Sequence, residues 1–266
     1  MKLFFREYGS KGPSLVIIHG LYGASDNWVS IARQLEKNYH VYLIDQRNHG
    51  QSPHDASHTY ADMAADLLEF FTTHTIEKAH VVGHSMGGKT AMCFALKHPQ
   101  MIDKLVVLDI APKSYASFSN YGQITNNHRL IIQSMMKVNF EQVKSRHDVN
   151  TQLARLLPEK QLRQFLLKNV ERKKDGSYNW RLNLPALRAN LEIIMEGLSE
   201  HDHQPVNIPT VFIRGDESGY VMDEDMLLAR RFFPGSELVT IPKAGHWLHA
   251  QQPELLIKTL NYFLLD

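Results

Sequence analysis

The segment at residues 79–92, AHVVGHSMGGKTAM, constrains the fold more than any other part of the sequence. A near-continuous apolar run leads into Gly83-His84-Ser85-Met86-Gly87, and a helix-like segment follows at once. A strand that turns this sharply into a helix needs small residues on either side of the turn, and Gly83 and Gly87 meet that need. The segment therefore predicts a buried strand, a tight turn with Ser85 at its tip, and a helix.

Five further apolar runs rich in Val, Ile and Leu occur along the chain. Each is nearly continuous rather than alternating, which is typical of strands that are covered on both faces. The runs lie at residues 14–20, 40–45, 104–110, 210–215 and 237–242, and residues 1–12 predict a first strand and turn.

Helical patterns separate several of these runs. Residues 60–71 carry apolar side chains at helical spacing, and Thr59 with Asp62 supplies a helix start. Further helices are expected from near Met86 to a point before Pro99, and from near Pro253 onward. Alternating strands and helices predict an α/β fold with a mostly parallel, doubly wound sheet.

Residues 113–205 interrupt this alternation. They show little strand pattern and several amphipathic helix-like segments, so they are expected to form a helical insertion in a core made of residues 1–112 and 206–266. The insertion holds 14 Lys and Arg against 9 Asp and Glu, a balance of +5, whereas the rest of the chain balances at −4.

Charge, hydrophobicity and cysteine content give expectations about binding partners and location. A net charge of +1 gives no reason to expect nucleic-acid binding, and no apolar stretch is long enough to predict membrane insertion. The amino terminus does not resemble a signal peptide, and the single cysteine, Cys93, is expected to be a buried thiol. A lone cysteine fits a reducing compartment, so a cytoplasmic location is expected. The sequence predicts no oligomeric state.

Neither a cofactor nor a metal ion is expected. The chain has no Gly-x-Gly-x-x-Gly fingerprint and no Walker motif, which excludes the usual nucleotide-binding signatures. The run His201-Asp202-His203 contains metal-binding residue types. Three adjacent side chains do not easily face one ion, however, so a solvated loop is expected there.

Ser85 is a candidate nucleophile, and a serine hydroxyl needs a base at neutral pH. In strand–turn–helix sites of this kind the chain order is serine, acid, histidine. His246 lies in PKAGHWLH, between the last strand and the last helix, where a loop can return to the tip of the turn. His249 is the competing residue and is expected on the following helix, in a structural role.

The negative charge that develops on a carbonyl oxygen needs two preorganised N–H donors. The backbone N–H of Met86, directly after the nucleophile, is one candidate. The loop after the strand at 14–20 supplies the second, the N–H of Leu21. His19 in the same loop is expected to brace it.

The acid has two candidates. The turn after the strand at 210–215 reads Gly215-Asp216-Glu217-Ser218, where Asp216 is one residue past the glycine. Asp109 ends an apolar strand, where an unpaired carboxylate would be costly and a histidine partner would offset that cost. Asp109 is therefore favoured for orienting His246, with Asp216 as the alternative.

These motifs resemble the α/β-hydrolase superfamily, and within it the YbfF-like bacterial esterases. The matching segments are HGLYGASDNW, DQRNHGQS, GHSMGGKTAM, KLVVLDIAP, GSYNWRLNL and AGHWLHAQQP. The resemblance implies Ser85 as nucleophile, His246 as base and the earlier acid Asp109. In many members of the superfamily the acid stands instead three residues after the glycine of the later turn, where this sequence has Ser218. It also implies an eight-stranded sheet with a helical cap inserted after the strand that ends at Asp109.

The sequence thus predicts a cofactor-free serine hydrolase that cleaves small-molecule carboxylic esters or thioesters. The charge of the insertion suits an anionic leaving group such as coenzyme A. An acyltransferase or a carbon–carbon hydrolase with the same residues is the alternative, and a non-catalytic ligand-binding protein of this fold is a further one.

Overall fold

The computed structural model describes residues 1–116, 119, 121–199 and 204–265. Its core is a seven-stranded sheet in the order β1-β3-β2-β4-β5-β8-β9. Only β1 runs antiparallel to its neighbour, and the other pairings are parallel. The fold is therefore the predicted mostly parallel α/β type. The expectation of eight strands is wrong, since the main sheet of the described residues has seven.

The strands and helices follow the apolar runs closely, and all six runs form strands. The α-helix after the turn ends at Lys97, before Pro99, and the side-chain oxygen of Thr59 accepts a hydrogen bond from Asp62 N at the start of α2. The elements of the core are β1 (Phe5–Tyr8), β2 (Ser14–Ile18), η1 (Ser25–Trp28), α1 (Val29–Leu35), β3 (His40–Ile44), α2 (Tyr60–Thr73), β4 (Ala79–His84), α3 (Met86–Lys97), η2 (Pro99–Met101), β5 (Ile102–Leu108), β8 (Thr210–Gly215), α9 (Asp225–Phe232), β9 (Glu237–Ile241), α10 (Leu248–Gln251) and α11 (Pro253–Leu265).

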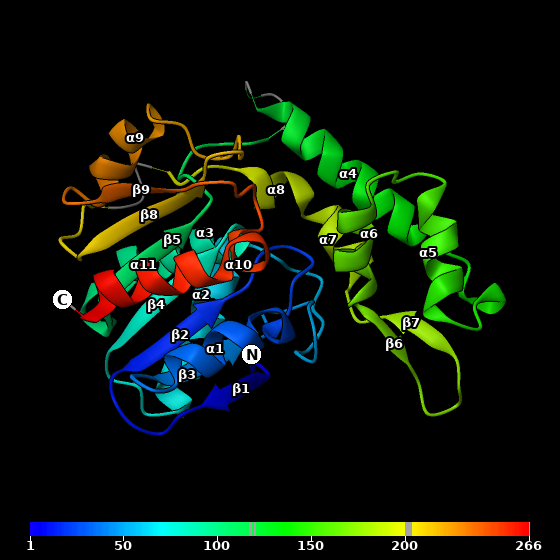
Figure 1. Cartoon of the computed structure of the whole chain (residues 1–266), viewed down its shortest axis with the longest axis horizontal. Helices are drawn as coiled ribbons and strands as arrows, with labels where there is room; N and C mark the ends of the chain where they lie inside the picture. The colour runs from blue at the N-terminus through cyan, green and yellow to red at the C-terminus, as the bar shows by residue number, and fades with distance from the viewer. Residues whose placement is uncertain (117–118, 120, 200–203, 266) are drawn as a thin grey trace.

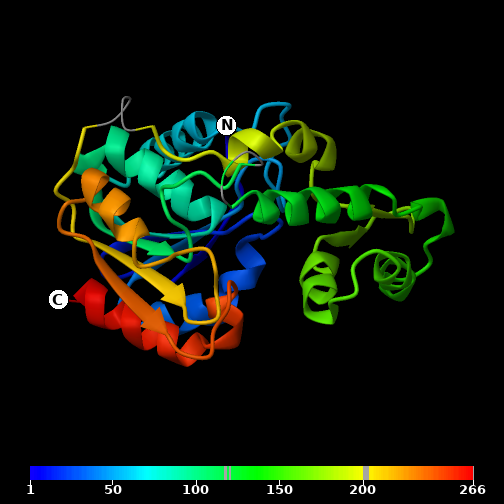
Figure 2. The same cartoon turned by 90° about the horizontal axis from the view of Figure 1, so that it is seen from above.

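Both faces of the sheet are covered, as the continuous apolar runs predict. Successive side chains of β2 point to opposite faces: Val16 and Ile18 belong to the apolar cluster that includes α2 and α3, whereas Leu15 and Ile17 belong to the one that includes α1 and α11. Figure 2 shows the two helical layers on either side of the strands. All four of these side chains are almost fully buried, so each face of the sheet carries an apolar core.

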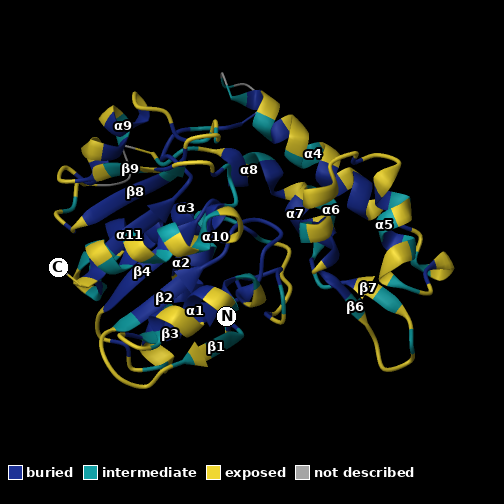
Figure 3. Ribbon diagram, viewed as in Figure 1, coloured by how far each residue is buried: buried dark blue, intermediate teal, exposed yellow. Residues whose placement is uncertain are grey.

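The segment between β5 and β8 extends to one side of the sheet (Figures 1 and 2). It contains α4 (Gly122–Met136), η3 (Phe140–Gln142), α5 (Arg146–Ala154), α6 (Lys160–Leu167), β6 (Val170–Arg172), β7 (Tyr178–Trp180), α7 (Leu184–Ala189) and α8 (Leu191–Met195). Many residues of its helices are exposed, whereas the central strands β2, β3, β4, β5 and β8 of the core are mostly buried (Figure 3).

The two-stranded β6–β7 hairpin was not expected from the sequence. Its strands have three residues each, too few for a periodic pattern to be recognised. The turn between them has Gly176 in the left-handed region at φ 88°, and the N–H of Lys173 donates to the carbonyl of Ser177. The helical prediction for the insertion therefore needs this correction.

Hydrogen bonds from the core hold the inserted segment at several points. Asn169 Nδ2 donates to the carbonyl of Tyr22 at 2.8 Å, and the Tyr60 hydroxyl donates to the carbonyl of Ile194 at 2.6 Å. The ammonium group of Lys89, on α3, donates to the carbonyl of Glu196 just after α8. These bonds fix the chain at the end of α6 and at the end of α8 against the core.

Two sequence-based expectations concern features away from this core. The run His201-Asp202-His203 lies outside the described residues. Within the described part of the chain, none of the helices combines the length and the hydrophobicity needed to cross a membrane.

Candidate active site

The turn between β4 and α3 has the strained shape that its sequence predicts. Ser85 lies at φ 53° and ψ −121°, a conformation that L-residues rarely adopt. A Cβ atom at Gly83 would stand 2.3 Å from the carbonyl oxygen of Gly87, and one at Gly87 would stand 2.4 Å from that of Ile18. Both glycines are therefore required by close backbone approach, and together they let the Ser85 side chain project from the end of the sheet.

His246 bridges Ser85 and Asp109. Its Nε2 lies 3.0 Å from Ser85 Oγ, and its Nδ1 lies 2.7 Å from Asp109 Oδ2. A carboxylate only accepts hydrogen bonds, so Nδ1 carries the proton and Nε2 is free to accept from the serine hydroxyl. The three side chains come from the loops after β4, β5 and β9, which end at the same edge of the sheet.

Asp109 is fully buried and receives three hydrogen bonds. Besides His246, the N–H of Gly215 donates to Oδ1 at 3.2 Å, and the hydroxyl of Ser218 donates to Oδ2. These donors satisfy a carboxylate that would otherwise be costly to bury. Ser218 thus stands at the position of the absent acid and supports the acid that is present.

Asp216 does not contact His246. Its side chain is exposed, and Oδ1 accepts a hydrogen bond from Ala244 N at 3.2 Å. Between the two candidate acids, the geometry brings only Asp109 to the histidine.

Aromatic residues hold the His246 ring and its backbone. Tyr220 stacks on the imidazole with ring centres 3.8 Å apart and planes 16° from parallel. His84 Nε2 donates to the His246 carbonyl at 2.7 Å, and burial, together with the nearby His246, lowers the pKa of His84 well below its usual value. Neither residue was expected at the site from the sequence. His84 could have been suspected because it directly precedes Ser85, whereas no sequence feature marked Tyr220.

His249, the competing histidine, has a different environment. It lies on α10, is buried, and stacks on Trp28 with ring centres 4.4 Å apart. Burial lowers its pKa to about 3, so it is neutral at physiological pH. His249 therefore packs against the core rather than contacting Ser85.

Two backbone N–H groups lie in the loops on either side of Ser85. Within the described part of the chain, neither Leu21 N nor Met86 N has a hydrogen-bond acceptor. The Leu21 loop is braced by His19, whose Nδ1 donates to the Gly20 carbonyl at 2.8 Å and whose Nε2 accepts from Gln46 N at 3.0 Å. The two N–H groups named from the sequence are thus available to a ligand.

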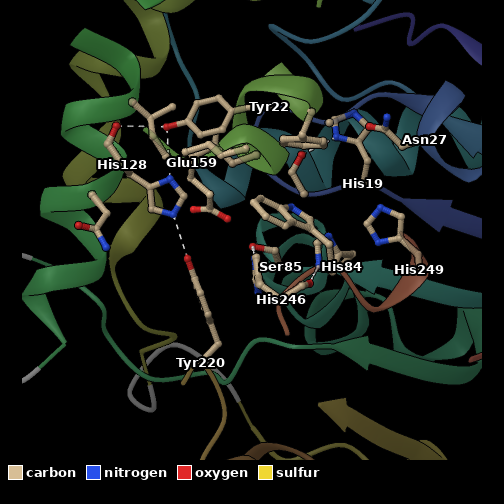
Figure 4. A pocket seen from close by; sticks show the side chains of 18 of the residues that line it. His19, Tyr22, Asn27, His84, Ser85, His128, Glu159, Tyr220, His246 and His249 are labelled. Atoms are coloured by element: carbon tan, nitrogen blue, oxygen red, sulfur yellow. Dashed lines mark hydrogen bonds between the residues drawn. The ribbon is translucent and has the colours of Figure 1, made fainter. Parts of the chain in front are cut away.

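Ser85 and His246 line a cavity of about 450 Å³. Its outer wall comes from the inserted segment and is mainly apolar, with the side chains of Leu130, Ile131, Leu157, Leu162 and Phe165. A cavity of this size and character accepts an acyl chain. Figure 4 shows the polar residues of this pocket, with Ser85 and His246 on its floor.

Comparison with known proteins assigns this arrangement to a family. The sequence profile of the alpha/beta hydrolase fold matches residues 13–253. The chain belongs to the alpha/beta hydrolase family. It is 35% identical to the esterase YbfF of Escherichia coli over 256 residues, which cover 95% of this chain and 93% of that one. It is also 36% identical over 272 residues to the sn-1-specific diacylglycerol lipase ABHD11 of Danio rerio, and the alignment covers 99% of this chain and 83% of that lipase.

A solved structure extends the comparison. A marine microorganism esterase superposes on this hydrolase with a TM-score of 0.94 and 46% identity, covering 98% of this chain and 99% of the other. These relatives confirm the predicted resemblance to YbfF-like esterases and agree with the prediction of an ester hydrolase.

In this hydrolase, a hydrogen-bonded chain along one side of the pocket joins the core to the insertion. His128 Nε2 lies 3.1 Å from the Tyr220 hydroxyl, and His128 Nδ1 lies 3.3 Å from the Tyr22 hydroxyl (Figure 4). Because the Tyr22 hydroxyl donates to the His128 carbonyl, it accepts from Nδ1, and Nε2 accepts from Tyr220. Burial lowers the pKa of His128 to about 3, so this histidine is uncharged.

A second cavity, of about 910 Å³, adjoins the first in this hydrolase. The two share Asn27, Phe165, Trp247 and His249 as a common wall. The second cavity carries the cationic side chains Arg146, Lys160 and Lys168 and, among the described residues, no acidic side chain. It therefore presents positive potential beside the serine pocket.

Proposed function

We propose that the protein is a serine hydrolase that cleaves carboxylic esters or thioesters through an acyl-enzyme on Ser85. The observation that carries the proposal is the continuous hydrogen-bonded chain Ser85–His246–Asp109, with contacts of 3.0 and 2.7 Å. This is the arrangement that activates a serine for acyl transfer. The names of the esterase and lipase relatives support the same activity.

In the proposed reaction, Ser85 Oγ attacks the acyl carbonyl carbon while its proton moves to His246 Nε2. Collapse of the tetrahedral intermediate breaks the bond to the leaving group, which takes the proton from Nε2. Water then attacks the acyl-serine, gives its proton to Nε2, and releases the acid as Ser85 recovers that proton. Asp109 keeps the imidazole in the required tautomer and stabilises its positive charge.

The N–H groups of Leu21 and Met86 are proposed to hold the oxyanion. Both are without an acceptor in the described residues, and Met86 N stands at the first turn of α3. There the helix N-terminus adds positive potential where negative charge develops. Loss of one such donor typically costs about 100- to 1,000-fold in turnover.

Residues 113–205 are proposed to act as a cap over a core of residues 1–112 and 206–266. The support is that side chains of α4 and α6 form a wall of the serine pocket. A cytoplasmic location is proposed as well, because the single thiol of the sequence, Cys93, is buried and cannot form an intrachain disulfide.

Thioesters with an anionic leaving group, such as short-chain acyl-CoA, are the second candidate substrates. The specific observation in their favour is the neighbouring cavity with Arg146, Lys160 and Lys168. Attraction of this kind weakens with salt. Turnover of a short-chain acyl-CoA should therefore fall across a salt series in which turnover of a neutral ester stays level, and an equal response of both would remove this candidate.

The test of the main proposal is labelling and turnover on the purified protein. A fluorophosphonate probe should modify Ser85, as read by peptide mass spectrometry, and Ser85→Ala should abolish both labelling and hydrolysis of a panel of p-nitrophenyl esters. Absence of labelling in the wild type would favour a non-catalytic ligand-binding role instead.

A further inference from the structure

The serine pocket contains one charged side chain that the proposed reaction does not use. Glu159 is the only Asp, Glu, Lys or Arg among the described residues that line this cavity. Figure 4 shows its carboxylate pointing into the pocket from the wall opposite Ser85. Glu159 is the N-cap residue of α6, yet its side chain makes no capping hydrogen bond, so helix formation does not explain its position.

Four of the five histidines that line the pocket leave this negative charge uncompensated. Burial lowers the pKa of His19, His84, His128 and His249, so these four are neutral at physiological pH. The fifth, His246, is hydrogen-bonded to Asp109. His128, the pocket histidine of the inserted segment, has both ring nitrogens engaged by tyrosine hydroxyls. Within the described residues, the Glu159 carboxylate has no hydrogen-bond donor and no ion pair.

The adjoining cavity has the opposite character. It carries Arg146, Lys160 and Lys168 and no described acid, and the rings of Phe165 and Trp247, 5.5 Å apart, form part of the wall between the two. The serine pocket is thus mainly apolar with one carboxylate, and its neighbour is cationic. A substrate that contains a negative charge is stabilised in only one of the two cavities.

From this contrast we propose that Glu159 is a specificity-determining residue, which disfavours acyl chains bearing a carboxylate relative to neutral chains and favours cationic ones. The inference rests on the proposed hydrolase activity and on the apolar wall that accepts the acyl chain. An acyl carboxylate in the pocket would face Glu159 without a neutralising cation, whereas a quaternary ammonium group would be attracted to it. Negative charge on the leaving group is not opposed, because the cationic cavity lies beside the pocket.

Three p-nitrophenyl esters of similar length test the proposal: those of pentanoic acid, of glutaric acid as the hemiester, and of γ-trimethylammonio-butyric acid. The readout is the ratio of kcat/KM for each charged ester to kcat/KM for the pentanoate, after correction for spontaneous hydrolysis. Because Glu159 is exposed to solvent, which screens its charge, the wild type should disfavour the hemiester and favour the cationic ester by only about five-fold each.

Glu159→Gln should bring both ratios toward one, and so should high salt applied to the wild type. The matched control is Glu141→Gln, an exposed acid of the inserted segment that does not line the cavity, and it should keep the wild-type ratios. Unchanged ratios in Glu159→Gln would overturn the proposal, and so would an equal change in Glu141→Gln, which would assign the effect to overall charge. Failure of the hydrolase proposal would look different from failure of this one, because neither the wild type nor either variant would then hydrolyse the pentanoate ester.

Discussion

The hydroxyl of Ser218 donates a hydrogen bond to Oδ2 of Asp109, the same carboxylate oxygen that accepts from His246. In many members of the α/β-hydrolase superfamily the acid stands at the position of Ser218. In this chain the candidate acid stands at the end of β5, and Ser218 donates to it. The turn after β8 therefore still takes part in the site, through a hydroxyl instead of a carboxylate.

The acid assignment predicts unequal effects of two matched substitutions. Asp109→Asn should lower kcat by about 1,000- to 10,000-fold, because an amide cannot hold the imidazole in the required tautomer. Asp216→Asn should change kcat little, since Asp216 is exposed and contacts only the Ala244 backbone. Steady-state kinetics with a neutral ester measure both. A large loss in Asp216→Asn with a small one in Asp109→Asn would reverse the assignment.

The contact between Ser218 and Asp109 predicts a coupled effect on stability. Ser218→Ala should lower the free energy of unfolding by about 1.5–3 kcal/mol, because the buried carboxylate loses a donor to a charged group. In an Asp109→Asn background the same change should cost less, since the charge is gone. Denaturant unfolding of the two single variants and the double variant measures this coupling, and strictly additive effects would contradict it.

The close approach at the turn predicts that Gly87 cannot carry a side chain. Gly87→Ala would place a methyl group 2.4 Å from the Ile18 carbonyl oxygen, so the protein should lose about 1–3 kcal/mol of stability and most of its turnover. Gly235→Ala is the control, because its Cβ would meet no atom within 4 Å. Thermal unfolding together with an ester assay checks both. Equal stability of the two variants would count against a steric requirement at the turn.

The buried ammonium group of Lys89 predicts a pH-dependent stability. Burial lowers its pKa to about 7, below the 10.5 of the unfolded chain, so the unfolded state binds more protons between these values and stability rises with pH there. Lys89→Met removes this dependence. One pKa unit corresponds to about 1.4 kcal/mol. From pH 7 to pH 9 the wild type should therefore gain at least about 1 kcal/mol of unfolding free energy that the variant does not gain. Urea unfolding at the two pH values measures it, and a constant difference would show that Lys89 does not titrate there.

The sequence predicted the core of the fold well, because its signals are local. Each apolar run formed a strand, and the helix that begins at Met86 ends before Pro99 as its proline requires. The β6–β7 hairpin was missed because strands of three residues carry no period. The count of eight strands came from resemblance alone, and the described residues form seven in the main sheet.

The candidate site could be predicted only in part. Ser85 has a local signal in its flanking glycines. Asp109 and Asp216 both follow parallel strands that end at the same edge of the sheet, so sequence position could favour one without deciding between them. The contact between Tyr220 and His128 joins residues 92 positions apart and depends on how the inserted helix α4 packs against the core. No periodic pattern or motif in the sequence predicts a long-range packing contact of this kind.

The sheet order has a consequence for the order in which activity arises during synthesis. β4 and β5, which position Ser85 and Asp109, are made well before β9 and the loop that holds His246. Under the proposed mechanism, a growing chain that ends at β8 would have the nucleophile and the acid without the base between them. Ser85 would then stay unactivated until the loop after β9 is made, so an unfinished chain would be protected from acylation at Ser85.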